Sequence, residues 1–357
     1  MKQRAVSRFV VALDLGGTKL AGALVDRAGK IVRRMSVGVN GSATGGPVRQ
    51  MVELVKAVAW PALADARSGK QSTRPDEIRS PKFEILAKGR SKTKTGSMEP
   101  PVQQSRLQVG AVGVAVPGLV RRDGTVWAPN LKGWTRMPLA RKLRDELGVP
   151  VIVESDRNAA VLGETWRGAA QGKRDAIVLM IGTGIGAGIL SDGGLLRGAH
   201  ELSGCAGWMT VREEHAGEAG RVGQLESLAA GPGIARAAEK DLARGVESLL
   251  NELPPGARNA YEVAEAARRG DMVSIDVFLE AGRLLGYGVA NLVSLFDPEV
   301  VVIGGGLAKA SDLYLDALRK AMKERAQPIA GSKVRVVVSR LGGDANLLGM
   351  ARRAWNL

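Results

Sequence analysis

The sequence predicts an α/β protein of two lobes or domains, and three observations support this fold class. Apolar stretches typical of buried strands alternate with segments whose apolar residues recur at helical spacing. Two units of strand, glycine-rich turn and strand lie about half the chain apart, which suggests an internal duplication. With 357 residues, 45% of them hydrophobic, the chain is long enough to bury a substantial core in each half.

Composition and charge narrow the class of protein. The one cysteine excludes a disulfide framework and a zinc site built mainly from thiolates. The net charge of +15 fits attraction to nucleic acid, and it fits equally well an enzyme with basic loops that handles anions. Only 4% of residues are aromatic, which argues against stacking platforms for single strands. Because no apolar run approaches a bilayer span, we expect a soluble, cytoplasmic, unprocessed protein.

In the first half, residues 9–15 and 20–25 read as strands around a Gly16-Gly17 turn. Apolar residues from Val48 to Ala59 predict a helix that ends at Trp60-Pro61, and residues 108–116 resume as a strand. Between them, residues 67–106 carry ten basic and four acidic side chains. So polar a segment cannot bury enough apolar surface to offset the entropy lost on ordering, and we therefore expect a disordered insertion. The alternative is a segment that binds nucleic acid or a partner protein.

The second half repeats this pattern. Residues 176–181 predict a strand, 182–188 a glycine-rich turn and 189–190 a return strand. Residues 276–296 form a long helical pattern that stops at Asp297-Pro298, and 300–303 form a buried strand leading into three glycines. A helix over about 345–355 ends the chain.

Three glycine clusters follow strands and suit phosphate binding. In residues 14–19 the glycines let backbone N–H groups approach an anion, Thr18 and Lys19 add a donor and a charge, and Asp14 can hold Mg²⁺ through water. Residues 182–188 and 304–306 offer similar backbone. The alternative for each cluster is an ordinary tight turn. Three such turns point jointly to a nucleotide cleft.

The second cluster also fits the dinucleotide pattern G-x-G-x-x-A. A Rossmann loop must open a helix, whereas the apolar residues and the Asp192-Gly193-Gly194 turn that follow here predict a hairpin. The chain contains no G-x-x-x-x-G-K-[ST], which removes a P-loop as well.

Taken in order, these motifs resemble those of the ROK family of bacterial sugar kinases. They comprise residues 14–19, 114–118, 128–134, 154–160, 182–188, 225–226 and 302–307. The resemblance implies two ribonuclease-H-like lobes around a nucleotide cleft, the actin/hexokinase-like ATPase fold. Residues 1–155 would form the N-terminal small lobe, including the 67–106 insertion, with the helix in 345–357 packing back on it. Residues 156–344 would form the C-terminal large lobe.

The resemblance also implies the roles of individual residues. Asp156 would be the catalytic general base, taking the proton of a sugar hydroxyl; without the other motifs it reads as a helix cap. ATP with Mg²⁺ would lie on Asp14, Gly16, Gly17, Thr18, Lys19, Gly182, Thr183, Gly184, Gly305 and Gly306. The sugar would contact Gly118, Asn130, Ser155, Asp156 and Glu226.

The chain departs from the family pattern in its sugar pocket. Ser155 replaces the usual asparagine of Glu-Asn-Asp, and Cys205 and Trp208 stand where Gly-Glu-x-Gly-His is usual. Trp208 would either stack on a sugar or fill the core, and Cys205 reads as a small buried filler. The usual zinc-binding cysteines are absent, with Gly217, Ala219 and Gln224 at the corresponding positions, so we expect no zinc.

Three functions follow for testing. The first is an ATP-dependent kinase for a hexose or amino-hexose, and the second is a nucleotide- or sugar-binding regulator with weak or no catalysis. The third is DNA binding, as in the repressors of the family, which carry an N-terminal helix-turn-helix module. About eight residues precede the first strand, which leaves no room for that module, so we expect no specific nucleic-acid partner. We expect no membrane partner. The sequence is compatible with a homodimer and does not decide the oligomeric state.

Overall fold

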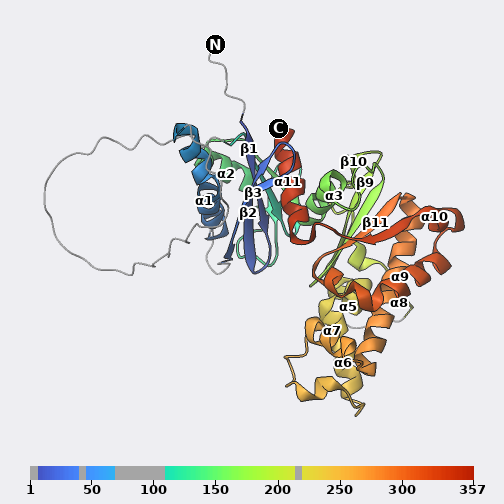
Figure 1. The fold of residues 1–357 in the computed structure, drawn as a ribbon. Coiled ribbons are helices and arrows are strands. Elements are labelled where there is room, and N and C mark those ends of the chain that lie inside the picture. Colours follow the sequence, from blue (N-terminus) through green and yellow to red (C-terminus); the bar gives the residue numbers. More distant parts are fainter. Residues whose placement is uncertain (1–6, 40–45, 69–108, 214–218) are drawn as a thin grey trace, which may run out of the picture.

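A computed structural model describes residues 7–39, 46–68, 109–213 and 219–357. The predicted insertion therefore lies outside the described residues, except for positions 67 and 68 at the end of a helix. Two five-stranded sheets lie beside one another with helices around them (Figure 1). This is the expected α/β architecture in two halves.

The first sheet has the strand order β3-β2-β1-β4-β7. β1 pairs antiparallel with β2 and parallel with β4, and β4 pairs parallel with β7. Its strands are β1 Phe9–Leu15, β2 Lys19–Asp26, β3 Ile31–Gly38, β4 Val112–Val116 and β7 Val151–Ser155. A small hairpin, β5 Leu119–Val120 and β6 Val126–Trp127, stands after β4.

The second sheet repeats this topology strand by strand. Its order is β10-β9-β8-β11-β12, with antiparallel pairing of β8 with β9 and parallel pairing of β8 with β11 and of β11 with β12. Its strands are β8 Ala176–Ile181, β9 Ile185–Ser191, β10 Gly194–Leu195, β11 Val300–Gly304 and β12 Arg335–Val338. Identical order and direction confirm the duplication suggested by the glycine turns.

The apolar run in β1 is buried on both faces of its sheet. Alternate side chains point to opposite faces, so Val11, Leu13 and Leu15 face one cluster while Val10 and Ala12 face another. Helices α1 Gly46–Ser68 and α2 Leu139–Leu147 belong to the first cluster. Helix α11 Ala345–Trp355 belongs to the second and packs on β1 and β4. A layer of helices therefore covers each face.

The second sheet supports a larger helical region. Its longest helix, α8 Met272–Phe296, begins at the cap Asp271 and packs along α9 Ser311–Arg325. The shorter helices are α4 Ala219–Val222, α5 Gln224–Ala229, α6 Gly231–Leu242, α7 Ala260–Arg268 and α10 Pro328–Lys333. Single 3₁₀ turns are η1 Ala206–Trp208, η2 Leu249–Glu252, η3 Gly306–Ala310 and η4 Gly342–Asp344.

Two helices lie side by side between the sheets (Figure 1). Helix α3 Asp156–Arg167 follows directly from β7, and α11 crosses it. Gly163 and Gly349 make this close crossing possible, because a Cβ on Gly163 would stand 2.0 Å from the Ala345 carbonyl oxygen and one on Gly349 1.8 Å from that of Ala159. The two halves are therefore joined by helices in backbone contact.

The structure differs from the sequence prediction in the end of one helix, in the length of one turn and in one strand that was not predicted. Helix α1 does not end at Trp60-Pro61 but runs to Ser68, because a proline inside a helix removes one hydrogen bond without preventing the next turns from forming. β9 begins at Ile185, so the glycine-rich turn is shorter than predicted. β3 has no counterpart in the sequence prediction. Within the described residues, no helix has the length and hydropathy needed to cross a membrane.

Candidate active site

Asp14 and Asp156 meet at the carboxyl edge of the first sheet. β1, β4 and β7 are parallel neighbours, so their ends lie together; Ala115 of β4 pairs with Asp14 on one side and Glu154 on the other. Asp156 follows β7 as the first residue of α3. The sheet thus brings together two predicted site residues that are far apart in the sequence.

Burial changes the electrostatics of both carboxyl groups. Desolvation raises the pKa of Asp14 to about 6, with a smaller rise from the negative charge of Asp156; a hydrogen bond from Asn346 and the charge of Arg34 oppose it. Desolvation also raises the pKa of Asp156, against the Arg157 N–H that donates to its Oδ1 at 2.8 Å. Both therefore bind a proton more readily than exposed aspartates do.

The first glycine turn is exposed beside this pair. Its Gly16 N–H donates to the Lys19 carbonyl at 2.8 Å, while Gly17, Thr18 and Lys19 face solvent. Among the described residues, no atom lies within 4 Å of a Cβ built on Gly17, so this side of its backbone is open to a ligand. On the other side Asn346 Nδ2 donates to Asp14 Oδ1 at 3.0 Å. The turn is thus tied to α11 and open outward, as a phosphate loop requires.

The second and third glycine turns lie against each other in the second sheet. The Gly182 N–H donates to Gly184 O at 2.9 Å, and a Cβ on Gly182 would lie 3.8 Å from the Gly306 nitrogen. Gly305 has φ +83° and its backbone lies so close to Ile181 that an added Cβ would stand 2.3 Å from the Ile181 oxygen. Only glycine fits there. Thr183 and Gly306 are exposed on this double turn.

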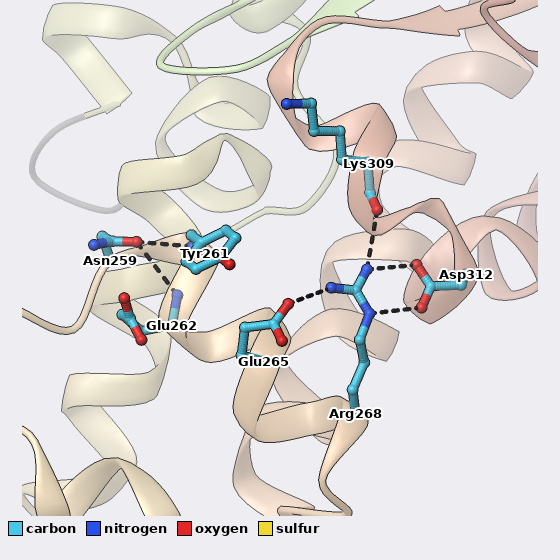
Figure 2. A network of polar contacts seen from close by, with 7 residues as sticks. All are labelled: Asn259, Tyr261, Glu262, Glu265, Arg268, Lys309 and Asp312. Carbon is cyan, nitrogen blue, oxygen red and sulfur yellow. Dashed lines mark hydrogen bonds and ion pairs between the residues drawn. The ribbon is translucent and has the colours of Figure 1, made fainter.

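A salt-bridge network holds the third turn in place (Figure 2). Arg268 of α7 pairs with Asp312 of α9 through two hydrogen bonds of 3.0 and 2.8 Å and also pairs with Glu265. Its Nη2 donates to the carbonyl oxygen of Lys309 at 2.9 Å, within η3 just after Gly306. The bidentate pair therefore fixes the turn to two helices.

Glu226 lies beside the second turn. Its Oε2 accepts the Ile185 N–H at 2.7 Å, and carbon atoms added to Gly184 or Gly207 would stand 2.8 Å from its side chain. Desolvation raises the pKa of Glu226, and the hydrogen bond from Ile185 lowers it in part. The carboxylate thus lies between the second glycine turn and the Gly204–Trp208 segment. The resemblance to the ROK family predicts a contact of Glu226 with the sugar.

The pattern of the ROK family matches residues 96–355 of this chain. The chain belongs to the ROK family. It is 30% identical over 347 residues to a glucokinase of Halalkalibacterium halodurans, covering 96% of this chain and 93% of that protein. A ROK family glucokinase from Streptomyces griseus, solved with glucose and AMPPNP, has a TM-score of 0.70 at 30% identity, over 98% of this chain and all of that one. The predicted actin/hexokinase-like fold is confirmed.

The ROK relatives are not all enzymes by name. A xylose repressor of Caldicellulosiruptor bescii is 33% identical over 247 residues, which cover 67% of this chain and 60% of the repressor. Membership of the family therefore leaves the kinase and the regulator as separate hypotheses.

The remaining predicted sugar contacts lie around β7 and the β5–β6 hairpin. Gly118 packs its backbone against Trp127 and Ala128, two residues before the exposed Asn130. The hydroxyl of Ser155 is buried without a hydrogen-bond partner among the described residues. These positions keep their predicted roles as hypotheses.

The residues that depart from the ROK pattern have clear environments. Trp208 is 57% exposed, so the interpretation as core filler is wrong. Cys205 is half-buried, and Arg157 Nη1 approaches its sulfur at 3.8 Å. Gln224 is buried, and its amide makes hydrogen bonds of 2.7 to 3.0 Å with the backbone of Val211 and Arg212. The zinc prediction also concerns Gly217, which lies outside the described residues, and the side chain of Ala219, which is not described.

Sequence reasoning missed two supports of the site. Asn346 fixes Asp14, and no motif indicated it because the two residues are 332 positions apart. Glu154, 1% exposed, is held by Arg197, whose Nη1 donates at 3.1 Å, and by Asn158 at 3.0 Å. The sequence motif named Glu154, but its partner lies 43 residues further on.

Proposed function

We propose that the protein is an ATP-dependent sugar kinase that transfers the terminal phosphoryl group of ATP to a hydroxyl of a hexose or amino-hexose. The observation that carries the proposal is the placement of Asp14 and Asp156 at one sheet edge, near enough for the charge of Asp156 to raise the pKa of Asp14, beside an open glycine turn. The similarity to glucokinases over nearly the whole chain supports it.

The residues present fit ATP with Mg²⁺. The open backbone at Gly17 and the exposed Lys19 suit phosphate oxygens, and the Asp14 carboxylate is a hard oxygen ligand of the kind Mg²⁺ takes through water. On the second sheet, Gly182, Thr183, Gly184, Gly305 and Gly306 suit the rest of the nucleotide. When bound, the nucleotide supplies the phosphoryl group and the ion neutralises its charge.

Asp156 acts as the general base in this proposal. Its raised pKa makes it a better proton acceptor than an exposed aspartate. The proton of the sugar hydroxyl passes to a carboxylate oxygen of Asp156 as the hydroxyl oxygen attacks phosphorus. Gly118, Asn130, Ser155 and Glu226 orient the sugar, and that positioning supplies much of the rate.

The two groups of site residues sit on different sheets. Asp14, Asp156 and the first turn belong to the first sheet and its edge, whereas the second and third turns and Glu226 belong to the second half. Among the described residues, no hydrogen bond or ion pair joins the first glycine turn, at Gly16–Lys19, to the second and third glycine turns. We propose that ligand binding draws the groups together about the α3–α11 pair.

The test of this function is a survey of acceptors. The protein is incubated with ATP, Mg²⁺ and each member of a hexose and amino-hexose panel, and the sugar phosphate is detected by mass spectrometry. We expect one acceptor to give product and ADP in equal amounts. ATP turnover without a sugar phosphate, or no turnover with any acceptor, contradicts the kinase proposal.

The second candidate is a regulator of the same fold, and two observations favour it. Trp208 and Cys205 replace polar sugar contacts, and the chain matches a xylose repressor over 67% of its length. Calorimetry separates the candidates. A sugar that binds with a measurable Kd, yet yields no phosphorylated product over hours, identifies the regulator, whereas product formation removes it.

A further inference from the structure

A cavity of ≈ 900 Å³ lies along β7, the edge strand of the first sheet. Its walls come from the turn of the β5–β6 hairpin, the start of α2, the strand β7 itself, the end of α11 and the segment after β10. Its volume is in the range of pockets that hold small molecules. None of the predicted nucleotide or sugar contacts lines it.

Seven arginines line this space, which we call the arginine cavity: Arg121, Arg122, Arg136, Arg141, Arg144, Arg197 and Arg353. Only two acidic residues, Asp123 and Glu201, stand among the lining residues. The lining therefore carries a large excess of positive charge in a concave space, where the field of each charge adds to the others.

Three of these arginines have acidic partners. Arg122 pairs with Glu201 at 2.8 Å, Arg136 pairs with Asp123 at 2.9 Å, and Arg197 pairs with Glu154. The Glu154 pair uses an acid outside the lining. These pairs hold the walls in position but leave the other four charges unmatched.

The remaining four are Arg121, Arg141, Arg144 and Arg353, and none has an ion pair within the described part of the chain. Arg121 has one hydrogen bond, from Nη1 to the Thr135 carbonyl at 3.2 Å. The Nε of Arg353 is buried and has no hydrogen-bond partner. An unpaired buried donor on a cation carries a desolvation cost, which adds to the repulsion among these unmatched charges.

We propose that the arginine cavity binds a small, multiply charged phosphate compound at a site separate from the nucleotide turns. Planar guanidinium groups match phosphate oxygens through paired hydrogen bonds, which favours phosphate over a simple monovalent anion. The cavity is enclosed on several sides and its lining has no aromatic residue, which favours a small compound over a nucleic-acid strand. A phosphorylated sugar and an inorganic polyphosphate share this chemistry.

The arginine cavity is also linked by hydrogen bonds to the residue before Asp156, the candidate base. Arg197 lines the cavity and holds Glu154, whose Oε1 accepts the Ser155 N–H at 3.0 Å, one residue before Asp156. An anion that draws Arg197 toward the cavity competes with Glu154 for this guanidinium. The site is therefore placed to influence the acceptor end of the active site.

The test is calorimetry on the full chain with two probes, inorganic tripolyphosphate and glucose 6-phosphate. Each is titrated into wild type and into the double variant Arg141→Ala/Arg144→Ala, whose side chains are exposed and unpaired. The control Arg269→Ala/Arg335→Ala removes the same charge at exposed positions outside the cavity. Lys19→Ala reports on binding at the nucleotide turns, and circular dichroism checks that each variant is folded.

We expect one molar equivalent of at least one probe to bind wild type, the control and Lys19→Ala alike. The cavity variant should bind it at least about tenfold more weakly, since each arginine contributes charge-assisted hydrogen bonds. The probe that binds identifies the source, an ester or an inorganic chain. The proposal is overturned if probe affinity falls equally in the cavity variant and the control, or falls only in Lys19→Ala. It is also overturned if neither probe binds. Tighter binding of a short oligonucleotide than of both probes also overturns it.

Discussion

Replacing Gly349 by alanine tests whether the contact between α3 and α11 fixes the geometry of the site. The added Cβ would stand 1.8 Å from the Ala159 carbonyl oxygen. A carbon and a carbonyl oxygen normally lie no closer than about 3.3 Å, so the two helices must separate by roughly 1.5 Å. No side chain can move aside to avoid this, because the atom met is backbone.

The magnitude follows from two opposing effects. Alanine stabilises a helix by about 1 kcal/mol relative to glycine, whereas forcing a packed interface apart costs about 1–3 kcal/mol and sometimes more. The difference between these two effects is a net loss of up to about 2 kcal/mol in the free energy of unfolding. Turnover should fall further, by about a hundredfold, because α11 carries Asn346 against Asp14 and α3 begins at Asp156.

The assays are urea unfolding followed by circular dichroism and steady-state turnover under conditions where the variant is folded. Gly220→Ala is the control, since no atom of the described part of the chain lies within 4 Å of its added Cβ. The control should match wild type in turnover and be no less stable. If Gly349→Ala were as stable and as active as wild type, the reasoning about this crossing would be refuted.

Three further predictions concern other parts of the structure. Asp271→Ala should lower the free energy of unfolding by about 2 kcal/mol, measured by urea unfolding, because Asp271 caps α8 and accepts from Ser274 and Leu249. Burial tends to raise the pKa of Asp271, but these hydrogen bonds outweigh it and lower the pKa. The loss of unfolding free energy in the variant should therefore be complete above about pH 4 and should vanish as pH falls through the lowered pKa. A loss of stability that grows in acid would contradict this. The pKa of Asp156 is raised by burial, so kcat/KM should fall with decreasing pH along a limb above the ordinary aspartate range, and a limb at or below about pH 4 would argue against this base. Arg268→Lys should weaken binding of an ATP analogue about threefold in calorimetry while Arg283→Lys does not, because lysine cannot make the bidentate pair with Asp312; equal affinities would show that this network does not support the third turn.

The fold could be predicted well where the local pattern was strong. Residues 176–181 and 300–303 are uninterrupted apolar runs, and residues 9–15 are apolar except for Asp14. Each forms a central strand buried on both faces. β3 was missed because Arg33 and Arg34 interrupt its apolar residues, which is typical of an exposed edge strand. The end of α1 was wrong because proline weakens a helix without always ending it.

The candidate site could be predicted only as separate motifs. Asp14 and Asp156 were named from their local sequence, and their proximity depended on the parallel neighbours of β4. Asn346, the contact of Gly163 with Ala345, and the pairing of Arg197 with Glu154 depend on helices and loops that meet only after folding. Such long-range contacts leave no periodic or spacing signal in a single sequence.

The most direct test of the central claim is the variant Asp156→Asn, assayed with the acceptor sugar found in the survey. Asparagine keeps the size of the side chain but cannot take the hydroxyl proton, so kcat should fall by about 10²- to 10⁴-fold. The Kd of a non-hydrolysable ATP analogue, measured by calorimetry, should remain within about threefold of wild type. Turnover equal to that of wild type would contradict the assignment of Asp156 as the base of a phosphoryl transfer.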